Sequence, residues 1–207
     1  MATYAFNSAA LFHIALTARD RALTNPADTI VTVVIAVAGL ESFVNELLER
    51  LRFDSHQPDA ELKRALAIAE AGNLYERTAG LPLKVQLLTV AFSGAQMDQG
   101  AQPYQDFDLL LAIRNAVVHQ RPELLPDSGG APAEDQRILK RLLARGLLRS
   151  LPSTDTIHTT FGGITDPAVA KWALDTALRM VRVVGELLPS AVAASVLMPY
   201  RALKLIE

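Results

Sequence analysis

Three residues near the middle of the chain have the types and the spacing needed to act on a phosphate. Arg114, Asn115 and His119 bring together a fixed cation, an amide and a titratable imidazole, a combination that occurs nowhere else in the sequence. At about 100° of rotation per helical residue, Asn115 and His119 share one face of a helix. The long side chain of Arg114 can partly close the remaining gap. We therefore expect all three side chains to be able to meet one phosphate.

The expected position of His119 favours this chemistry. An apolar helical run from Phe107 to Ile113 leads into the three residues, and Pro122 disfavours helical geometry at Arg121. The helix should therefore end near Gln120, with His119 in a solvent-accessible last turn. Histidine changes its charge near neutral pH, and a helix C-terminus favours positive charge.

These residues resemble the signature of a known superfamily. The stretch 114–119, Arg-Asn-Ala-Val-Val-His, is similar to the Arg-x4-6-His motif of HEPN domains in its common Arg-Asn-x-x-x-His form. Residues 38–45 resemble the early HEPN helix that often carries an acidic residue and an asparagine one turn apart, here Glu41 and Asn45. Residues 81–88, which include Lys84, resemble the lysine-containing middle helix of several bacterial members. The resemblance covers about residues 4 to 190.

The resemblance implies a fold, an activity and partners. HEPN domains are small all-α domains that typically dimerise, and many are metal-independent ribonucleases in toxin–antitoxin, abortive-infection and CRISPR-associated systems. By this resemblance the protein is a homodimeric endoribonuclease, a toxin or a defence protein, that needs no cofactor and no metal. Its partners would be RNA or a nucleotide, together with an antitoxin or a nucleotidyltransferase. Arg114, Asn115 and His119 would be catalytic, and Glu41 and Asn45 would support them.

The implied reaction assigns a role to each residue of the motif. RNA supplies its own nucleophile, the 2'-OH, which attacks the neighbouring phosphorus and leaves a 2',3'-cyclic phosphate and a 5'-OH end. His119 would be the base or the conjugate acid, and Arg114 would bind the phosphate and stabilise charge growing on its oxygens. Asn115 would orient the imidazole or donate to the phosphate. Because one histidine cannot readily serve as both acid and base, the resemblance implies that a C2 dimer supplies the second one.

The same residues are compatible with a different class of function. Some HEPN relatives only bind nucleotides or partners, so the alternative is a non-catalytic module that dimerises and binds a nucleotide or a protein. A third possibility is a structural dimer whose apolar tail, residues 191–206, covers a partner surface. Arg114 could instead pair with Glu41, Asp106 or Asp108, and His119 could bond helix-end carbonyls. Neither composition nor spacing separates these alternatives.

The two supporting residues allow two interpretations. Glu41 and Asn45 are one turn apart on a helix that is apolar nearly all round, so at least one of them should be partly buried. A buried carboxylate needs a partner, and either residue could hydrogen-bond the catalytic side chains. Otherwise Glu41 begins the solvated end of the helix, where we expect Glu46 and Glu49 to face solvent.

A second basic feature lies further along the chain. Arg137, Arg141, Arg145 and Arg149 recur at every fourth residue and are joined by Lys140, with no acidic residue between them. Such a stripe could follow an RNA backbone and would then bind more weakly at high salt. Such a stripe is more often a solvated face near a helix C-terminus, where cations are favourable anyway.

The composition argues against several classes of protein and of functional site. The chain has 207 residues, is 50% hydrophobic and carries a formal net charge of -2, which argues against a protein that coats nucleic acid through bulk charge. It has no cysteine, and its four histidines are scattered without metal-ligand spacing. The N-terminus lacks a basic signal region, and the most apolar stretch, residues 29–40, is too short to span a bilayer. We expect a cytoplasmic protein without a membrane partner.

Start and stop signals predict a succession of helices. Asn25 before Pro26 and Asp166 before Pro167 are predicted to cap helix starts, and Gly94 and Gly146 are predicted to end helices. Proline or glycine follows or opens most runs, and no strand alternation is convincing, so the fold class is an all-α, HEPN-like helical bundle with an up-and-down core, additional helices and a C-terminal helical tail. We expect one domain over residues 1–190 and a tail over 191–207 that packs on the domain or on a dimer partner. The expected helices span residues 4–23, 26–52, 58–77, 81–94, 104–120, 133–145, 167–188 and 191–206, the last interrupted at Pro199; residues 126–132 form a loop and 151–165 an excursion with a short hairpin.

Overall fold

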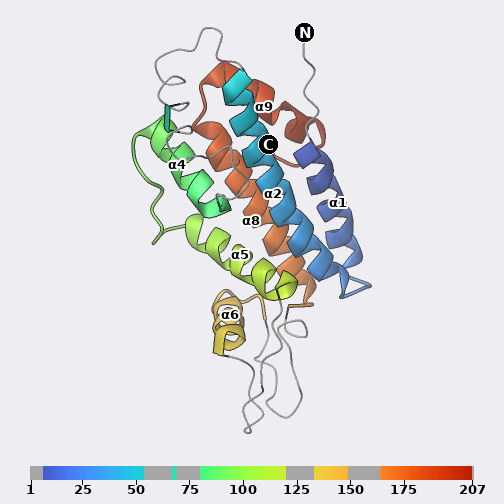
Figure 1. Cartoon of the computed structure of the whole chain (residues 1–207). Coiled ribbons are helices and arrows are strands. Elements are labelled where there is room, and N and C mark those ends of the chain that lie inside the picture. The colour runs from blue at the N-terminus through green and yellow to red at the C-terminus, as the bar shows by residue number, and fades with distance from the viewer. Residues whose placement is uncertain (1–6, 54–66, 69–79, 120–132, 149–163, 207) are drawn as a thin grey trace, which may run out of the picture. The chain divides into compact units, whose positions relative to one another are not determined.

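The part of the chain that the computed structural model describes is built from α-helices. It comprises residues 7–53, 67–68, 80–119, 133–148 and 164–206, and no strand occurs in these ranges. The all-α prediction is confirmed (Figure 1). The helices are α1 (Asn7–Arg21), α2 (Asp28–Phe53), α4 (Leu81–Ser93), α5 (Tyr104–Val118), α6 (Ala133–Ala144), α8 (Pro167–Glu186) and α9 (Ser190–Ala202).

The ends of three helices follow the predicted signals. Gly94 ends α4 with φ 77°, and Gly146 follows α6 with φ 68°, a left-handed conformation that side chains with a Cβ rarely adopt. At the start of α8, the Asp166 carboxylate accepts the backbone N–H of Ala168 at 2.8 Å. Local backbone chemistry therefore sets these boundaries.

The start of α2 differs from the prediction. The helix begins at Asp28 rather than at Pro26, because residues 25–27 form a turn whose carbonyls accept the N–H groups of residues 28–30 at 3.0–3.1 Å. Asn25 does not cap the helix through its side-chain oxygen. Its amide NH2 donates to the Asp28 carboxylate at 3.2 Å, and Arg21 pairs with the same carboxylate at 3.1 Å.

Some predicted elements lie outside the described residues. The loop at 126–132 and nearly all of the excursion at 151–165 are among them. Of the predicted helix at 58–77, only residues 67–68 are described, and they are helical.

The chain divides into two compact units that share long helices. The first unit comprises Met1–Leu11, Ala38–Gln105 and Leu178–Glu207, and the second comprises Phe12–Val37 and Asp106–Ala177. Helices α1, α2, α5 and α8 each contribute residues to both units.

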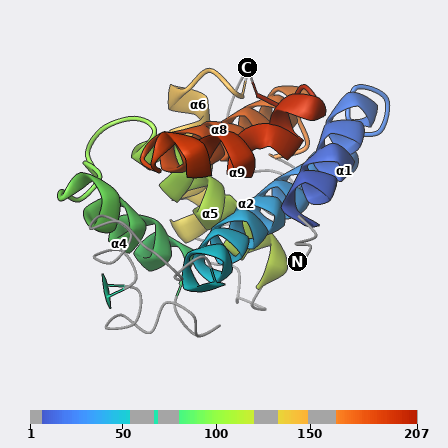
Figure 2. The same cartoon turned by 90° about the horizontal axis from the view of Figure 1, so that it is seen from above.

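In the first unit, α9 lies along the second half of α8 (Figure 2). A Cβ built on Gly185 of α8 would come within 2.7 Å of the Leu197 side chain of α9, so a larger residue at this position would require Leu197 to shift. Val196, Leu197 and Tyr200 of α9 are buried by the chain itself. Pro199 lies inside α9, which continues to Ala202, so the predicted interruption at Pro199 is wrong.

The core of the second unit forms around α5 and α8. Phe107, Leu110 and Ile113 bury one face of α5, and Val169, Ala170, Ala173, Leu174 and Ala177 bury one face of α8. Trp172, beside these residues in the chain, is half-buried. Its indole N–H is buried and has no hydrogen-bond partner in the structure as described.

One described helix is long and apolar enough to cross a membrane by length and composition. It is the Asp28–Arg50 part of α2, of which half is buried inside the protein. The apolar stretch is thus longer than residues 29–40, because the helix stays apolar past Glu41. Its buried face, which includes Val33, Val37, Leu40 and Leu47, is covered by the chain itself.

Candidate active site at the end of helix α5

The last turn of α5 is open to solvent. None of the residues 114–119 is buried, whereas Ile113 and the residues at 109–110 just before them are fully buried. His119 follows α5 directly and is exposed, and its backbone N–H donates to the Asn115 carbonyl at 2.9 Å. This bond keeps His119 in helical register one turn after Asn115, the position that the spacing predicts.

Arg114 and Asn115 are held together at this open end. The Arg114 guanidinium donates through Nη1 to Oδ1 of Asn115 at 3.0 Å. Asn115 therefore uses its carbonyl oxygen to orient the guanidinium, and its NH2 group is the part that can donate to a phosphate. From the sequence, we expect Asn115 to contact the imidazole or the phosphate. The contact with Arg114 was not predicted, and it leaves the NH2 group of Asn115 for the predicted ones.

The two supporting residues belong to the other unit. Glu41 and Asn45 are half-buried on the part of α2 in the first unit, whereas Arg114, Asn115 and His119 belong to the second. A joint site of these five residues stays a prediction. Within the first unit, Asn45 has a partner of its own.

That partner is Lys84, a buried lysine on α4. Lys84 is only 3% exposed, and its Nζ donates to Oδ1 of Asn45 at 2.7 Å. It lies on the same face of α4 as the buried Leu81, Val85 and Leu88. The sequence resemblance singled out both helices, but helical periodicity within each helix gives no information about contacts between them.

Glu46 is not on a solvent-exposed face, and the expectation for this residue is wrong. Its carboxylate accepts the Ser8 backbone N–H at 2.9 Å, the Ser8 hydroxyl, and the Ser42 hydroxyl at 3.0 Å. The Ser8 hydroxyl also shares a hydrogen bond of 2.6 Å with the Tyr200 hydroxyl. The group joins α1, α2 and α9, and its members are too far apart in sequence for periodicity to predict it.

Tyr200 is the one described residue with a resolved shift in pKa. Burial raises the pKa of its hydroxyl well above the ordinary value of 10.0, the hydrogen bond with Ser8 lowers it, and the nearby Glu46 charge raises it again. The ring contacts Phe43 edge-on, with centroids 5.6 Å apart. Tyr200 is therefore a neutral donor at physiological pH that is packed into the core.

Two arginines of the basic stripe form ion pairs with α5, and Arg149 lies outside the described residues. Arg145 pairs with Asp106 at 2.7 Å, and Arg141 pairs with Asp108 at 2.9 Å. Arg137 and Lys140 are exposed. The predicted contact of the stripe with RNA therefore depends mostly on these two exposed residues.

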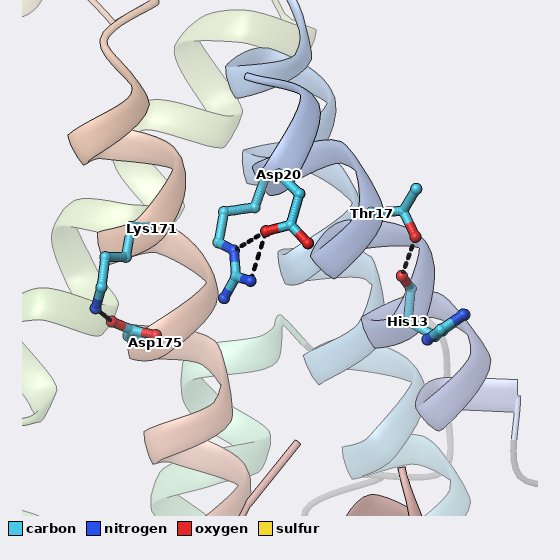
Figure 3. Close-up of polar contacts among 6 residues, drawn as sticks. His13, Thr17, Asp20, Lys171 and Asp175 are labelled. Carbon is cyan, nitrogen blue, oxygen red and sulfur yellow. Dashed lines mark hydrogen bonds and ion pairs between the residues drawn. The ribbon is translucent and has the colours of Figure 1, made fainter. Parts of the chain in front are cut away.

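Polar contacts on α1 and α8 in the second unit are exposed and local (Figure 3). The Thr17 hydroxyl donates to the His13 carbonyl at 3.0 Å, Arg19 pairs with Asp20, and Lys171 pairs with Asp175 one turn later. The His13 ring takes no part in these contacts. Among the described residues, no group of three or more histidine, aspartate or glutamate side chains could hold a metal ion.

The chain matches no family model, no curated protein and no solved structure.

Proposed function

We propose that the protein is a metal-independent endoribonuclease of the HEPN type that acts in the cytoplasm as a toxin or defence protein. The observation that carries the proposal is the Arg114–Asn115 hydrogen bond of 3.0 Å beside the exposed His119 at the open end of α5. A fixed cation, an amide and an imidazole within two helical turns are suited to one phosphodiester.

In this proposal each side chain has one task. His119 takes the proton of the 2'-OH as it attacks phosphorus, and a protonated imidazole returns a proton to the departing 5'-oxygen. Arg114 donates to the non-bridging oxygens, on which negative charge grows. Asn115 holds the guanidinium in place through Oδ1 and donates to the same phosphate through its NH2 group.

The proposal requires a second copy of the chain. One imidazole cannot be base and acid in the same step, so a homodimer would bring a second His119 into the site. The partly exposed apolar residues Ala116, Val117 and Val118, next to His119, are compatible with such a contact. An antitoxin or a nucleotidyltransferase is the protein partner that we propose for the dimer.

RNA cleavage in the presence of a chelator tests the proposal. We expect wild-type protein to cut RNA and to leave 2',3'-cyclic phosphate ends, and R114A and H119A to lose at least about a hundredfold in rate. His13→Ala, which removes an exposed histidine on α1, is the matched control and should keep full activity. Equal activity of all four proteins would show that residues 114–119 have a structural role. Lack of cleavage by folded wild-type protein would favour the non-catalytic module.

A further inference from the structure

Asp108 lies on the face of α5 that carries the candidate site. At about 100° per helical residue, the positions of Asp108, Asn115 and His119 fall within about 40° of one another around the helix axis. Asp108 lies about 10 Å before Asn115 along this axis. Its side chain is 58% exposed, so this face presents a carboxylate to whatever binds at Asn115 and His119. A strand of RNA that follows the face towards His119 therefore meets another negative charge.

Arg141 of α6, the helix beside α5 in Figure 1, compensates this charge. Its guanidinium lies 2.9 Å from the Asp108 carboxylate, and its side chain is 25% exposed. Water screens such a pair, so the pair contributes little to stability. A phosphate offers a guanidinium the same two-point hydrogen bonding as a carboxylate. A phosphate that approaches along α5 can therefore take the place of Asp108 at little cost.

The neighbours of Arg141 on α6 extend the basic surface and keep the helix in place. Arg137, one turn earlier, and Lys140 are exposed. Arg145, one turn later, pairs with Asp106 at 2.7 Å, and their side chains are only 21% and 11% exposed. This second pair and the buried apolar face of α6 hold the helix on α5 when Arg141 changes its partner. Arg141 is therefore the residue of the stripe that can alternate between α5 and a ligand.

We infer that Asp108 occupies the place of an RNA phosphate and holds Arg141 until a strand of RNA displaces it. In the bound state Arg141 binds the backbone of the strand together with Arg137. The displaced carboxylate stays beside the strand and lowers the affinity for it, which favours release of the cut product. The inference rests on the proposed function and deepens it. The substrate is an oligonucleotide that reaches from Asn115 to α6, because about 10 Å of α5 separates Asn115 from Asp108.

Binding of an oligonucleotide that cannot be cut tests this exchange. A single-stranded 2'-O-methyl RNA keeps every phosphate and lacks the attacking hydroxyl, so fluorescence anisotropy measures its Kd without cleavage. Asp108→Asn removes the carboxylate that holds Arg141 and should lower the Kd about two- to fivefold. Asp175→Asn is the matched control, because it also removes one carboxylate from an exposed ion pair, on α8, and makes the same change in net charge. It should leave the Kd unchanged.

Arg141→Gln makes the test specific to the exchange. This substitution should raise the Kd and reduce the slope of log Kd against log salt concentration by about 0.7, the loss of one phosphate contact with a single strand. In the same background Asp108→Asn should lose most of its effect, since no guanidinium is released. Four outcomes overturn the inference: no binding by the wild type, equal Kd values for wild type and D108N, an equal gain from D175N, or a full gain from D108N in the R141Q background.

This test is separate from the cleavage test of the proposed function. A protein that cuts RNA but binds the oligonucleotide equally well with and without the Asp108 carboxylate keeps the proposed function and loses this inference. A protein that shows the expected Kd values but does not cut RNA keeps the binding surface and loses the ribonuclease activity.

Discussion

At the scale of single residues, the Glu46 carboxylate accepts three hydrogen bonds. It accepts from Ser8 twice and from Ser42 once, and these donors lie on two helices. Hydrogen bonds to a charged group are stronger than those between neutral groups. Removal of this carboxylate leaves a buried backbone N–H and a buried hydroxyl of Ser8 without their acceptor.

We therefore expect Glu46→Ala to lower the free energy of unfolding by about 1.5–3 kcal/mol. Glu49→Ala is the matched control on the same helix, and its effect should be about 0.5 kcal/mol or less. Urea unfolding of both variants, followed by circular dichroism, measures the difference. Equal effects of the two substitutions would contradict the role that the hydrogen bonds give to Glu46.

The raised pKa of the Tyr200 hydroxyl predicts that stability depends on pH in the alkaline range. Its pKa is raised in the folded protein above the value of about 10 in the unfolded chain, mainly by burial. The folded state thus holds this proton more tightly, and the resulting stability is fully present below about pH 10 and is lost as the pH rises above it. Below about pH 10 the Tyr200 hydroxyl does not make the free energy of unfolding depend on pH.

Tyr200→Phe removes this titration and keeps the packing against Phe43. The difference in Tm between wild type and the variant should be constant from about pH 7 to 9, and it should shrink above about pH 10. The other groups that titrate at alkaline pH are the same in both proteins, so they do not affect the difference in Tm. A difference that stays constant to pH 11 would show that the hydroxyl is not buried.

At the scale of helices, ion pairs dock α6 against α5. The side chains of the Arg145–Asp106 pair are 21% and 11% exposed, whereas those of the Arg141–Asp108 pair are 25% and 58% exposed. Water screens the second pair more strongly. Removal of one partner of the first pair leaves a largely buried charge.

Double-mutant cycles with alanine should separate the two pairs. We expect a coupling energy of about 1–3 kcal/mol for Arg145 with Asp106 and about 0.2–1 kcal/mol for Arg141 with Asp108. The second value should fall further at high salt. A smaller coupling for the Arg145 pair than for the Arg141 pair would contradict this difference in burial.

Helices α8 and α9 approach closely at Gly185, which has no side chain. Because a Cβ at position 185 would come within 2.7 Å of Leu197, that side chain must shift, and Gly185→Ala should destabilise the protein by about 1 kcal/mol after the gain in helix propensity is included. The same substitution should cost markedly less in a Leu197→Ala background, where the clash is relieved. Chemical denaturation of the four proteins tests this, and an equal cost in both backgrounds would show that the clash is not its cause.

The sequence predicts local features of these helices better than contacts between them. Proline, aspartate and glycine signals predict the start of α8 and the ends of α4 and α6, because the conformation there depends on one or two residues. The start of α2 was predicted wrongly, because the Asn25 amide donates to the Asp28 carboxylate instead of capping the helix. Glu46 and Lys84 could not be assigned, because Ser8 lies 38 residues from Glu46 and Asn45 lies 39 residues from Lys84.

The same limit applies to the candidate site. The register of Asn115 and His119 follows from helical periodicity, and it is correct because the His119 N–H donates to the Asn115 carbonyl just after the end of α5. The bond from Arg114 to Asn115 joins sequence neighbours, but spacing alone does not predict which side chain the amide oxygen selects.

At the scale of the whole molecule, the net charge of -2 provides no general attraction to RNA. Under the proposed function, RNA must be held by local groups: Arg114 and Asn115 at the end of α5, and the exposed Arg137 and Lys140 on α6. Arg137→Ala with Lys140→Ala should weaken RNA binding and reduce its salt dependence. Filter binding at several salt concentrations measures this, and an unchanged slope would exclude α6 from the RNA contact.

The proposed second histidine makes oligomeric state part of the mechanism. Light scattering at micromolar concentration should give twice the 22.4 kDa mass of the chain. A clean monomer mass would contradict both the dimer and the shared site.

Subunit mixing provides the stricter test, because it distinguishes a dimer with one shared site from a dimer of two independent sites. If each cleavage needs His119 from both subunits, an H119A subunit inactivates the wild-type subunit with which it pairs. After exchange with about a tenfold excess of H119A protein, only about a tenth of the wild-type chains pair with one another, so the cleavage rate per wild-type chain should fall about tenfold. His13→Ala protein in the same excess should not inhibit, since it keeps the motif intact. A rate per wild-type chain that is unaffected by the H119A excess would mean that each chain supplies its own acid and base, and a group other than a second His119 would then have to protonate the 5'-oxygen.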